Sequence, residues 1–475
     1  MATLSAQQQP AADDTFERVS PVDGQIVSTE RADDRDSCLQ FAAGAAAAFP
    51  QWSQQSAQAR GDYLVRVAAE LEKRRDDFLL SMADEIGAPV GWIEQNIHFA
   101  AEILRETARY ADEVDQVEQL PGRSDLNSRA VRMPCGVCLC ISPWNAPLVL
   151  GARAIAMPLL CGNTVLLKGS EFAPRSFRLF GEVLKAAGLP ETVARVILTR
   201  AEDSEEVVEA LIASPVVRRV NFTGSTRVGR RVAELSAKHL KRSLLELGGQ
   251  SAMLVLADAD IELAAAAALE GGYTNQGQVC MSTERLIVAD ELADALSARI
   301  EAGRRQLKFG DPRDAATTVG PVVSIAAADR LSGLISDAVA KGAELVGGGT
   351  AHDAYLEPTL LDRVEPDMRV YREEVFGPIL AMTRVASDLE AITVANDSEY
   401  GLACAVFSAN EERAETVAQQ LHSGICHINR CTIDDTPHAP FGGVKSSGYG
   451  RFGGRWAIHE FTELRWLTSA RKPGD

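Results

Sequence analysis

The spacing of apolar residues divides the chain into a helix-rich first part and two later parts in which strands and helices alternate. Between residues 35 and 115, apolar residues recur at intervals of three and four, which predicts amphipathic helices. A strand-rich stretch follows from residue 128. The first alternating block has expected strands at 194–199 and 217–223 and expected helices at 175–188, 204–214 and 226–239. The second has expected strands at 251–258 and 284–290 and expected helices at 260–274 and 291–307.

Alternation of strands and helices with short connections is typical of parallel sheets that carry helices on both faces, so the sequence predicts an α/β fold. A domain boundary is expected near residue 247, where Gly248 and Gly249 permit a sharp change of chain direction. The closing segment 461–470 has the pattern of a strand, but no helix follows that could cover it. We expect this strand to pair elsewhere, and another subunit is one candidate.

Composition favours a globular enzyme and argues against two classes of partner. A chain of 475 residues with 46% hydrophobic residues is long enough for two or three domains. Its formal net charge of −18 argues against nucleic acid and anionic membranes, which select basic surfaces. The polar residues 1–14 lack the features of a signal or transit peptide and are expected to form a flexible tail. The apolar region 146–168 is interrupted by Arg153, Pro158 and Asn163, so we expect no membrane span and a cytoplasmic location.

The nine cysteines form no pattern that predicts disulfides or a metal site. The run CGVCLC at 135–140 has closely spaced thiols, but they alternate with apolar residues and no second ligand pair follows at a zinc spacing. The run is therefore expected to be a buried strand. The seven histidines are dispersed without an HExxH motif, so no metal cofactor is predicted.

Three polar residues in separate segments could carry nucleophilic chemistry. Cys280 lies in NQGQVCMSTER, and the residues after it are expected to start a helix whose N-terminus would favour a thiolate; a buried structural thiol is the alternative. Glu246 in LLELGGQ is expected at a strand end, where burial would raise its pKa toward that of a general base; a carboxylate bonded to the Gly-Gly turn is the alternative. Asn145 in SPWNAP could donate its amide to an oxyanion or form an ordinary Asx turn.

Two further segments have features of a dinucleotide site. The segment NFTGSTRVGRR places Gly224 and Ser225 at the expected start of a helix, where free backbone N–H groups accept phosphate. A simple helix cap has the same features, and neither the three-glycine fingerprint nor a P-loop is present. Lys168 and Glu171 follow an expected strand in VLLKGSE, where they could bind ribose hydroxyls or form a surface ion pair.

Together and in their order, these motifs resemble those of the NAD(P)-dependent aldehyde dehydrogenase superfamily. The matching segments cover nearly all of the chain beyond the first residues: SPWNAP, AMPLLCGNTVLLKGSE, NFTGSTRVGR, LELGGQSAMLVLADAD, NQGQVCMSTER, EEVFGPIL and PFGGVKSSGYGRFG. The segments QVCMSTER, WNAPLVLGARAIAMPLLCGNT and SSGYGRFGG resemble the branch that oxidises aromatic aldehydes such as salicylaldehyde, vanillin and benzaldehyde.

The resemblance implies a mechanism and a set of site residues. Cys280 would attack the aldehyde carbon, the Asn145 amide and the Cys280 N–H would hold the oxyanion, and Glu246 would activate the water that hydrolyses the thioester after hydride transfer. NAD is expected as the cofactor, because Glu171 would repel the 2′-phosphate of NADP. NADP is the alternative. The residues implied for the cofactor are Ile141, Ser142, Trp144, Lys168, Glu171, Gly224, Ser225, Leu247, Glu374 and Phe376. Those implied for the substrate pocket are Trp92, Val149, Arg153, Val279 and Met281.

Within the implied pocket, Trp92 suits a flat ring, and Arg153 suits a ring hydroxyl or phenolate. The alternative interpretations are packing beneath the helices for Trp92 and an internal ion pair for Arg153. Asp434 and Asp435 depart from the family pattern, in which aromatic or apolar residues are common at these positions. The exact aldehyde therefore stays open.

Three other functions stay open at this point: a dehydrogenase of aliphatic aldehydes or semialdehydes, a CoA-acylating aldehyde dehydrogenase, and a cysteine esterase. Glu246 argues against CoA acylation, because hydrolysis of a thioester needs a positioned base. An esterase would have no use for the segments around Ser225 and Lys168.

The resemblance also implies an aldehyde dehydrogenase fold with a Rossmann-like cofactor domain, an α/β catalytic domain and a small β oligomerisation arm. The expected bounds are 15–117 and 139–247 for the cofactor domain, 248–430 for the catalytic domain, 118–138 and 455–475 for the arm, and 431–454 for a substrate-side loop that returns to the cofactor domain. We expect a homo-oligomer, a dimer or tetramer, that takes a small-molecule aldehyde and has no nucleic-acid or membrane partner.

Overall fold

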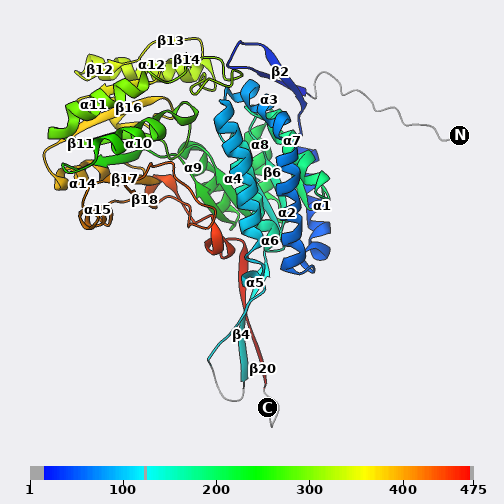
Figure 1. The fold of residues 1–475 in the computed structure, drawn as a ribbon. Helices are drawn as coiled ribbons and strands as arrows, with labels where there is room; N and C mark the ends of the chain where they lie inside the picture. The colour runs from blue at the N-terminus through cyan, green and yellow to red at the C-terminus, as the bar shows by residue number, and fades with distance from the viewer. Residues whose placement is uncertain (1–14, 122–125, 471–475) are drawn as a thin grey trace.

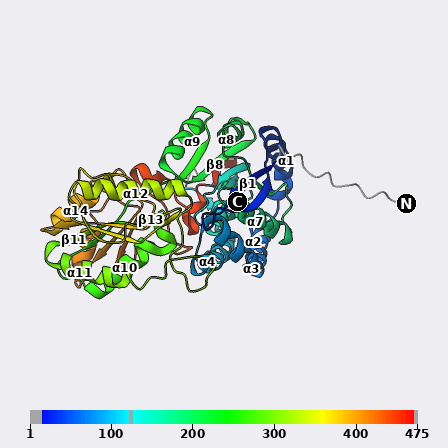
Figure 2. The same cartoon turned by 90° about the horizontal axis from the view of Figure 1, so that it is seen from above.

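The computed structural model describes residues 15–121 and 126–470, and the expected tail at 1–14 lies outside them. Two α/β bodies lie side by side, and a narrow β arm projects from one of them (Figure 1). The view from above separates the same two bodies, with α10, α11, α12 and α14 around one sheet and α1–α4 and α7–α9 around the other (Figure 2). The predicted α/β class is confirmed.

The first part of the chain forms a layer of helices, as the apolar spacing predicts, preceded by a strand pair that the sequence analysis did not predict. The strands are β1 (Thr15–Val19) and β2 (Ile26–Arg31); the helices are α1 (Arg35–Ser53), α2 (Ala57–Lys73), α3 (Arg75–Ile86), α4 (Val90–Ala108) and α5 (Ala111–Val114). In α2, the apolar stripe of Leu64, Val67 and Leu71 is almost completely buried. Ser56 caps the N-terminus of α2 by accepting from the Ala59 N–H, which satisfies one of the free donors there.

The cofactor-side sheet has six strands in the order β19-β9-β8-β5-β6-β7, all parallel except β19. The strands are β5 (Val137–Ile141), β6 (Thr164–Lys168), β7 (Ala194–Ile197), β8 (Val217–Thr223), β9 (Arg242–Glu246) and β19 (Gly448–Tyr449). The helices between them are α6 (Pro147–Leu160), α7 (Pro174–Ala186), α8 (Ser204–Ala213) and α9 (Thr226–Lys238). The fully buried β5 confirms the strand predicted for CGVCLC from Val137 onward, whereas Cys135 precedes the strand and is half-buried. The strand order reverses between β5 and β8, and in such sheets ligands bind outside the carboxyl ends at that point.

The second sheet has seven strands in the order β12-β15-β16-β11-β10-β17-β18, and only β12 runs antiparallel to its neighbour. The strands are β10 (Ser251–Val255), β11 (Thr283–Ala289), β12 (Glu344–Gly347), β15 (Thr359–Asp362), β16 (Ile379–Val385), β17 (Ala403–Phe407) and β18 (Ile425–Ile428). The helices are α10 (Ile261–Tyr273), α11 (Asp290–Arg304), α12 (Ile325–Ala340), α13 (Arg369–Arg372), α14 (Asp388–Asn396) and α15 (Glu411–Ala418). The short elements are η2 (Thr274–Gly277), β13 (Ala351–His352), β14 (Tyr355–Leu356), η3 (Lys445–Ser447) and η4 (Gly454–Ile458).

The C-terminal strand finds its partner within the chain. Residues of β20 (Thr462–Ala470) pair antiparallel with β4 (Leu126–Pro134), which also pairs with β3 (Val117–Gln119). These strands form the projecting arm (Figure 1). On β20 the side chains of Leu464 and Trp466 are 60% and 71% exposed, so the arm presents apolar surface. The residue bounds assigned to the domains from the sequence remain predictions.

Among the helices of residues 15–121 and 126–470, none combines the length and apolar character that crossing a membrane requires.

Candidate active site

Two cavities meet at the turn between β5 and α6. The first, of about 400 Å³, is lined by Cys280, by Asn145 and by all five residues expected to contact the substrate. The second, of about 790 Å³, follows the carboxyl ends of β5, β6 and β8 and is lined by Trp144. Because Trp144 and Asn145 are consecutive, the two cavities lie on either side of one short turn.

Cys280 does not precede a helix, so that expectation from the sequence is wrong. It lies in a turn between η2 and β11, and β11 pairs with strands on both sides. Just before it, Asn275, Gln276 and Gly277 have φ values of +49°, +57° and +67°. Left-handed backbone at a non-glycine residue costs about 1–3 kcal/mol and is typical of functional sites.

Buried amide side chains hold this strained turn. The Gln276 Nε2 donates to the carbonyl oxygens of Gly87 and Pro321, both at 2.8 Å. The Gln278 Oε1 accepts from the Val323 N–H at 2.8 Å. These contacts reach far along the chain, so the position of the thiol depends on the packing of both bodies.

The surroundings of Cys280 keep its thiol protonated. Burial, and then the neighbouring Glu246 carboxylate, raise the pKa of Cys280 to about 12, and the nearby Arg153 guanidinium opposes this rise only in part. The expected lowering of the pKa by a helix N-terminus is absent, because no helix begins there. The side chain is partly exposed. The thiol is thus accessible from the cavity but needs a base before it can act as a nucleophile.

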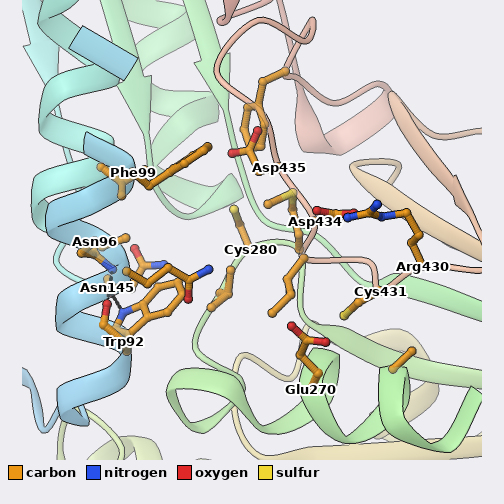
Figure 3. A pocket seen from close by; sticks show the side chains of 18 of the residues that line it. Trp92, Asn96, Phe99, Asn145, Glu270, Cys280, Arg430, Cys431, Asp434 and Asp435 are labelled. Carbon is orange, nitrogen blue, oxygen red and sulfur yellow. Dashed lines mark hydrogen bonds and ion pairs between the residues drawn. The ribbon is translucent and has the colours of Figure 1, made fainter. Parts of the chain in front are cut away.

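Asn145 is fixed beside Cys280 by three hydrogen bonds. Its backbone oxygen accepts from the Trp92 Nε1 at 3.0 Å and from the Asn275 Nδ2 at 3.2 Å, and its own Nδ2 donates to the Gln278 carbonyl at 3.0 Å. Figure 3 shows Asn145 and Trp92 together on one side of Cys280. A side-chain amide has two N–H donors, so Asn145 retains one for another acceptor.

Glu246 is the last residue of β9 and is only 2% exposed. Neither of its carboxylate oxygens makes a well-aligned hydrogen bond within the described residues, although the Gly443 N–H acts on the carboxylate and lowers its pKa. Burial raises the pKa of Glu246 well above its usual value, against the opposing charges of Arg153 and Arg451. A Cβ at Gly442 would lie 2.7 Å from the Glu246 Oε1, so this position leaves no room for a side chain. Burying an acid without well-aligned hydrogen-bond partners is costly in free energy. The raised pKa that results makes the ionised form of Glu246 a stronger general base.

The second cavity gathers seven of the ten residues expected to bind the cofactor: Ile141, Ser142, Trp144, Lys168, Glu171, Gly224 and Ser225. Ser225 is the N-cap of α9, as predicted, and its Oγ accepts from the Val228 N–H at 3.4 Å. Ser142 has a buried Oγ without a partner in the described chain. Lys168 and Glu171 form an ion pair at 3.6 Å, and burial lowers the pKa of Lys168.

The other three expected cofactor residues lie beyond this lining. The Leu247 N–H donates to the Ser447 carbonyl at 3.0 Å. The Glu374 Oε1 accepts from the Gly249 N–H at 2.9 Å. The ring of Phe376 meets that of Trp144 edge-on, with centroids 5.8 Å apart. Phe376 is thereby held next to the turn where the two cavities meet.

Sequence reasoning missed several residues that line the first cavity. Gln95, Asn96 and Phe99 lie three, four and seven positions after Trp92 on α4, so helical spacing from Trp92 could have found them. Others come from α10 and from the segment 429–441: Glu270, Asn429, Arg430, Cys431, Ile433 and Phe441. Figure 3 shows Glu270, Arg430 and Cys431 across the cavity from α4, where only the tertiary fold brings them.

Arg153 lines the same cavity but is already paired. Its Nη2 donates to the Asp435 Oδ2 at 2.5 Å, and both side chains are largely buried, at 5% and 13% exposure. Its guanidinium also lies over the Phe441 ring, 4.0 Å from the centroid. The internal ion pair was the alternative interpretation of Arg153, and here it coexists with a position in the cavity wall.

No group of three or more His, Cys, Asp or Glu side chains in the described part of the chain could hold a metal ion.

Comparison with known proteins identifies the class of enzyme to which this geometry belongs. The model of the aldehyde dehydrogenase family matches residues 8–467, and the chain is a member of that family.

Particular relatives are also similar over nearly their whole length. A vanillin dehydrogenase of Pseudomonas fluorescens is 49% identical over 99% of this chain and 98% of its own. A crystal structure of a salicylaldehyde dehydrogenase from Pseudomonas putida G7, complexed with salicylaldehyde, superimposes with a TM-score of 0.95 at 43% identity and covers 97% of this chain and 96% of that one. A crystal structure of PnpE in complex with nicotinamide adenine dinucleotide has a TM-score of 0.92 at 35% identity and covers 96% of this chain and 94% of that one.

Proposed function

We propose that this chain oxidises an aromatic aldehyde to the carboxylic acid, with NAD as hydride acceptor and Cys280 as nucleophile. The observation that carries the proposal is one cavity that holds a partly exposed thiol, a fixed amide donor and aromatic walls from Trp92 and Phe99. The vanillin and salicylaldehyde dehydrogenases among its relatives support an aromatic substrate.

The first step is removal of the Cys280 proton. Because burial raises the pKa of both Cys280 and Glu246, each group resists ionisation, and the Glu246 charge acts directly on Cys280. Transfer of the thiol proton to the ionised Glu246 carboxylate leaves one negative charge in the site, so a carboxylate and a thiolate never have to coexist there. The raised pKa of Glu246 makes its ionised form a stronger acceptor for that proton.

Attack of the Cys280 sulfur on the aldehyde carbon leaves a negative oxygen. The second N–H of the Asn145 amide and the Cys280 backbone N–H are the donors assigned to it. Because Trp92 and Asn275 both hold the Asn145 backbone, this donor is oriented before substrate arrives. An aldehyde ring that extends from this position would lie between Trp92 and the residues around Arg153.

The second cavity fits NAD. Its orphaned Ser142 Oγ, the N-terminus of α9 capped by Ser225, and the Lys168–Glu171 pair offer partners for a phosphate and a ribose. When bound, NAD would supply the nicotinamide that accepts the hydride from the carbon bonded to Cys280. Glu374 and Phe376 are assigned to the nicotinamide end, because Phe376 packs on Trp144 at the junction of the cavities. Glu171 disfavours the 2′-phosphate of NADP.

Glu246 completes the reaction. After the thioester has formed and Glu246 has passed the thiol proton on to solvent, its carboxylate takes a proton from water. The resulting hydroxide attacks the carbonyl carbon, the C–S bond breaks, and the acid is released while Cys280 leaves as the thiolate. The Asn145 and Cys280 donors stabilise the second oxyanion in the same way as the first.

One panel tests this assignment. NADH production is measured with benzaldehyde, salicylaldehyde, vanillin, cinnamaldehyde and straight-chain aldehydes, each with NAD and with NADP. We expect the aromatic compounds with NAD to give the highest kcat/KM, and Cys280→Ala to abolish oxidation of all of them. Release of acyl-CoA in place of free acid, or ester hydrolysis without any aldehyde oxidation, would contradict the proposal.

We also propose a homo-oligomer that forms through the arm, because Leu464 and Trp466 expose large apolar side chains on β20. Light scattering of the wild type and of Leu464→Glu tests this proposal: we expect an oligomeric wild type and a smaller mass for the variant. A monomeric wild type contradicts it. A reducing compartment, the cytoplasm, is the proposed location, since Cys280 must remain a free thiol to react.

A further inference from the structure

The wall of the first cavity carries charges that the proposed chemistry does not use. Five charged side chains line it: Arg153, Arg430, Glu270, Asp434 and Asp435. Arg430 pairs with Asp434, and Arg153 pairs with Asp435. The two arginines face three carboxylates, so the lining has one net negative charge.

Arg153 is the one cation of this wall that is almost fully buried. Its side chain is 5% exposed, whereas that of Arg430 is 69% exposed and in contact with solvent. A buried guanidinium beside an aldehyde site would attract a substrate carboxylate strongly, because charge–charge interactions gain strength as water is excluded. The Asp435 carboxylate at 2.5 Å occupies that role within the chain itself.

The contacts of Arg153 leave little room for a second carboxylate. The Phe441 ring covers one face of the guanidinium at 4.0 Å, and the Phe99 ring lies 6.0 Å from it. Figure 3 shows Phe99 and Asp435 in the upper part of the cavity, Asp434 beside Arg430 at the height of Cys280, and Glu270 below them. An anionic group would therefore meet a neutralised arginine at one end and carboxylates elsewhere.

We propose that Asp435 is a specificity-determining residue: by neutralising Arg153 it restricts the cavity to aldehydes without an anionic group. This inference rests on the proposed function and deepens it, since it names neutral aryl aldehydes as the substrate class. A neutral ring hydroxyl can still bond to the Asp435 Oδ1 or to the remaining guanidinium N–H groups of Arg153. A substrate carboxylate, in contrast, finds the Arg153 charge already neutralised and is repelled by the net negative charge of the wall.

A matched pair of substrates separates charge from size. The same enzyme is assayed with para-carboxybenzaldehyde and with its neutral methyl ester, methyl para-formylbenzoate, and the two kcat/KM values are compared. Asp435 and Arg153 also influence the pKa of Cys280 and Glu246, but such effects are common to both substrates and cancel in the ratio. For the wild type we expect the ester to be preferred by about tenfold or more, mainly through KM, as for like charges brought together.

Two variants assign that preference. Asp435→Asn frees Arg153 and is expected to reduce the preference for the ester about tenfold. The control, Asp434→Asn, removes the same charge from the next residue of the same wall. Because its partner Arg430 is exposed and solvent screens that pair, the preference for the ester is expected to fall by much less, about threefold or less. If Asp435→Asn does not fold, Arg153→Met serves instead: it leaves Asp435 unpaired and is expected to increase the preference for the ester.

Equal kcat/KM values for acid and ester in the wild type would overturn the inference, and so would equal shifts in Asp435→Asn and Asp434→Asn. Butanal and succinic semialdehyde form a second pair, neutral and anionic, in the same assay. If only the straight-chain pair is oxidised, the aromatic assignment fails, but the charge comparison keeps its force with that pair.

Discussion

Glu284 provides a sharp test of how the proposed nicotinamide end of the site is held. It is the second residue of β11, is 3% exposed, and lies four residues after Cys280. Its Oε2 accepts from the Val375 N–H at 2.8 Å and its Oε1 from the Phe376 N–H at 2.7 Å. Phe376 has a φ of +46°, so one buried carboxylate fixes a left-handed residue.

The cost of losing this carboxyl group can be worked out bond by bond. Burial and the nearby Glu374 raise the pKa of Glu284 to about 8, so the group is mostly a neutral acid at pH 7. Leaving a buried N–H without its partner costs about 1–3 kcal/mol. In Glu284→Gln one oxygen remains to accept an N–H, but the amide nitrogen faces the other N–H, so one bond is lost and one buried donor is left unpaired. The left-handed backbone of Phe376, with its intrinsic cost of about 1–3 kcal/mol, then has half its support. We expect a loss of about 2–4 kcal/mol, divided between unfolding of the protein and release of the segment that carries Glu374 and Phe376.

The assay separates these two effects. A Glu284→Gln enzyme should have a lower Tm and a KM for NAD raised about tenfold or more, since about 1.4 kcal/mol corresponds to a factor of ten. Its KM for the aldehyde should change little, because Glu284 does not line the first cavity. The matched control is Glu373→Gln on the same segment, whose partner is the exposed Arg369 and whose loss should cost less than about 1 kcal/mol. The reasoning is refuted if Glu284→Gln matches Glu373→Gln in both Tm and KM for NAD.

Three further predictions concern the buried acids and the amide donor. Glu246→Gln should give a burst of NADH and then turnover slowed about 10²–10⁴-fold in stopped-flow traces, because the thioester lacks its base, and a wild-type steady-state rate would remove Glu246 from the mechanism. Asn145→Ala should lower kcat by about 10²–10³ in steady-state assays, and a change in KM alone would exclude an oxyanion role. Burial raises the pKa of Glu85 to about 7, so the folded chain retains a proton there that the unfolded chain releases near its usual value of 4.5. The Glu85 contribution to stability should therefore decrease as pH rises from about 4.5 to 7. Urea unfolding at both pH values should show a smaller decrease for Glu85→Gln than for the wild type, and identical decreases would contradict the shift.

The sequence predicted the elements whose pattern is local. The strand ends that carry Lys168 and Glu246, and the cap at Ser225, follow from apolar runs and turn residues and are confirmed. The helix expected after Cys280 fails because Met281, Glu284 and their neighbours suit a helix only in isolation. In the fold, the segment joins a parallel sheet between β10 and β16, and pairing on both edges overrides local propensity.

The sequence could not predict contacts between distant segments. Arg153 and Asp435 are 282 positions apart, and the bonds of Glu284 to Val375 and Phe376 span about ninety. Arg153 on α6 and Asp435 after β18 come from different parts of the fold, and Glu284 on β11 meets the segment that leads into the neighbouring strand β16. Both contacts therefore depend on tertiary packing. The partner and the burial of each charged side chain, which the tertiary structure sets, decide whether it binds substrate or supports another residue.

The Arg153–Asp435 pair also links substrate choice to acid–base chemistry. Arg153 lowers the pKa of both Cys280 and Glu246, whereas Asp435 raises both; Glu374 raises that of Cys280, and Arg451 lowers that of Glu246. Asp435→Asn removes one raising charge and leaves the lowering charge of Arg153 in place. The pH–rate profile of kcat for a neutral aryl aldehyde should therefore move to lower pH in this variant. The Asp434→Asn control should shift the profile much less, because Asp435, and not Asp434, is among the charges that mainly set the pKa of Cys280 and of Glu246. An Asp435→Asn profile that stays at the wild-type pH, or moves to higher pH, would contradict this electrostatic role of Asp435.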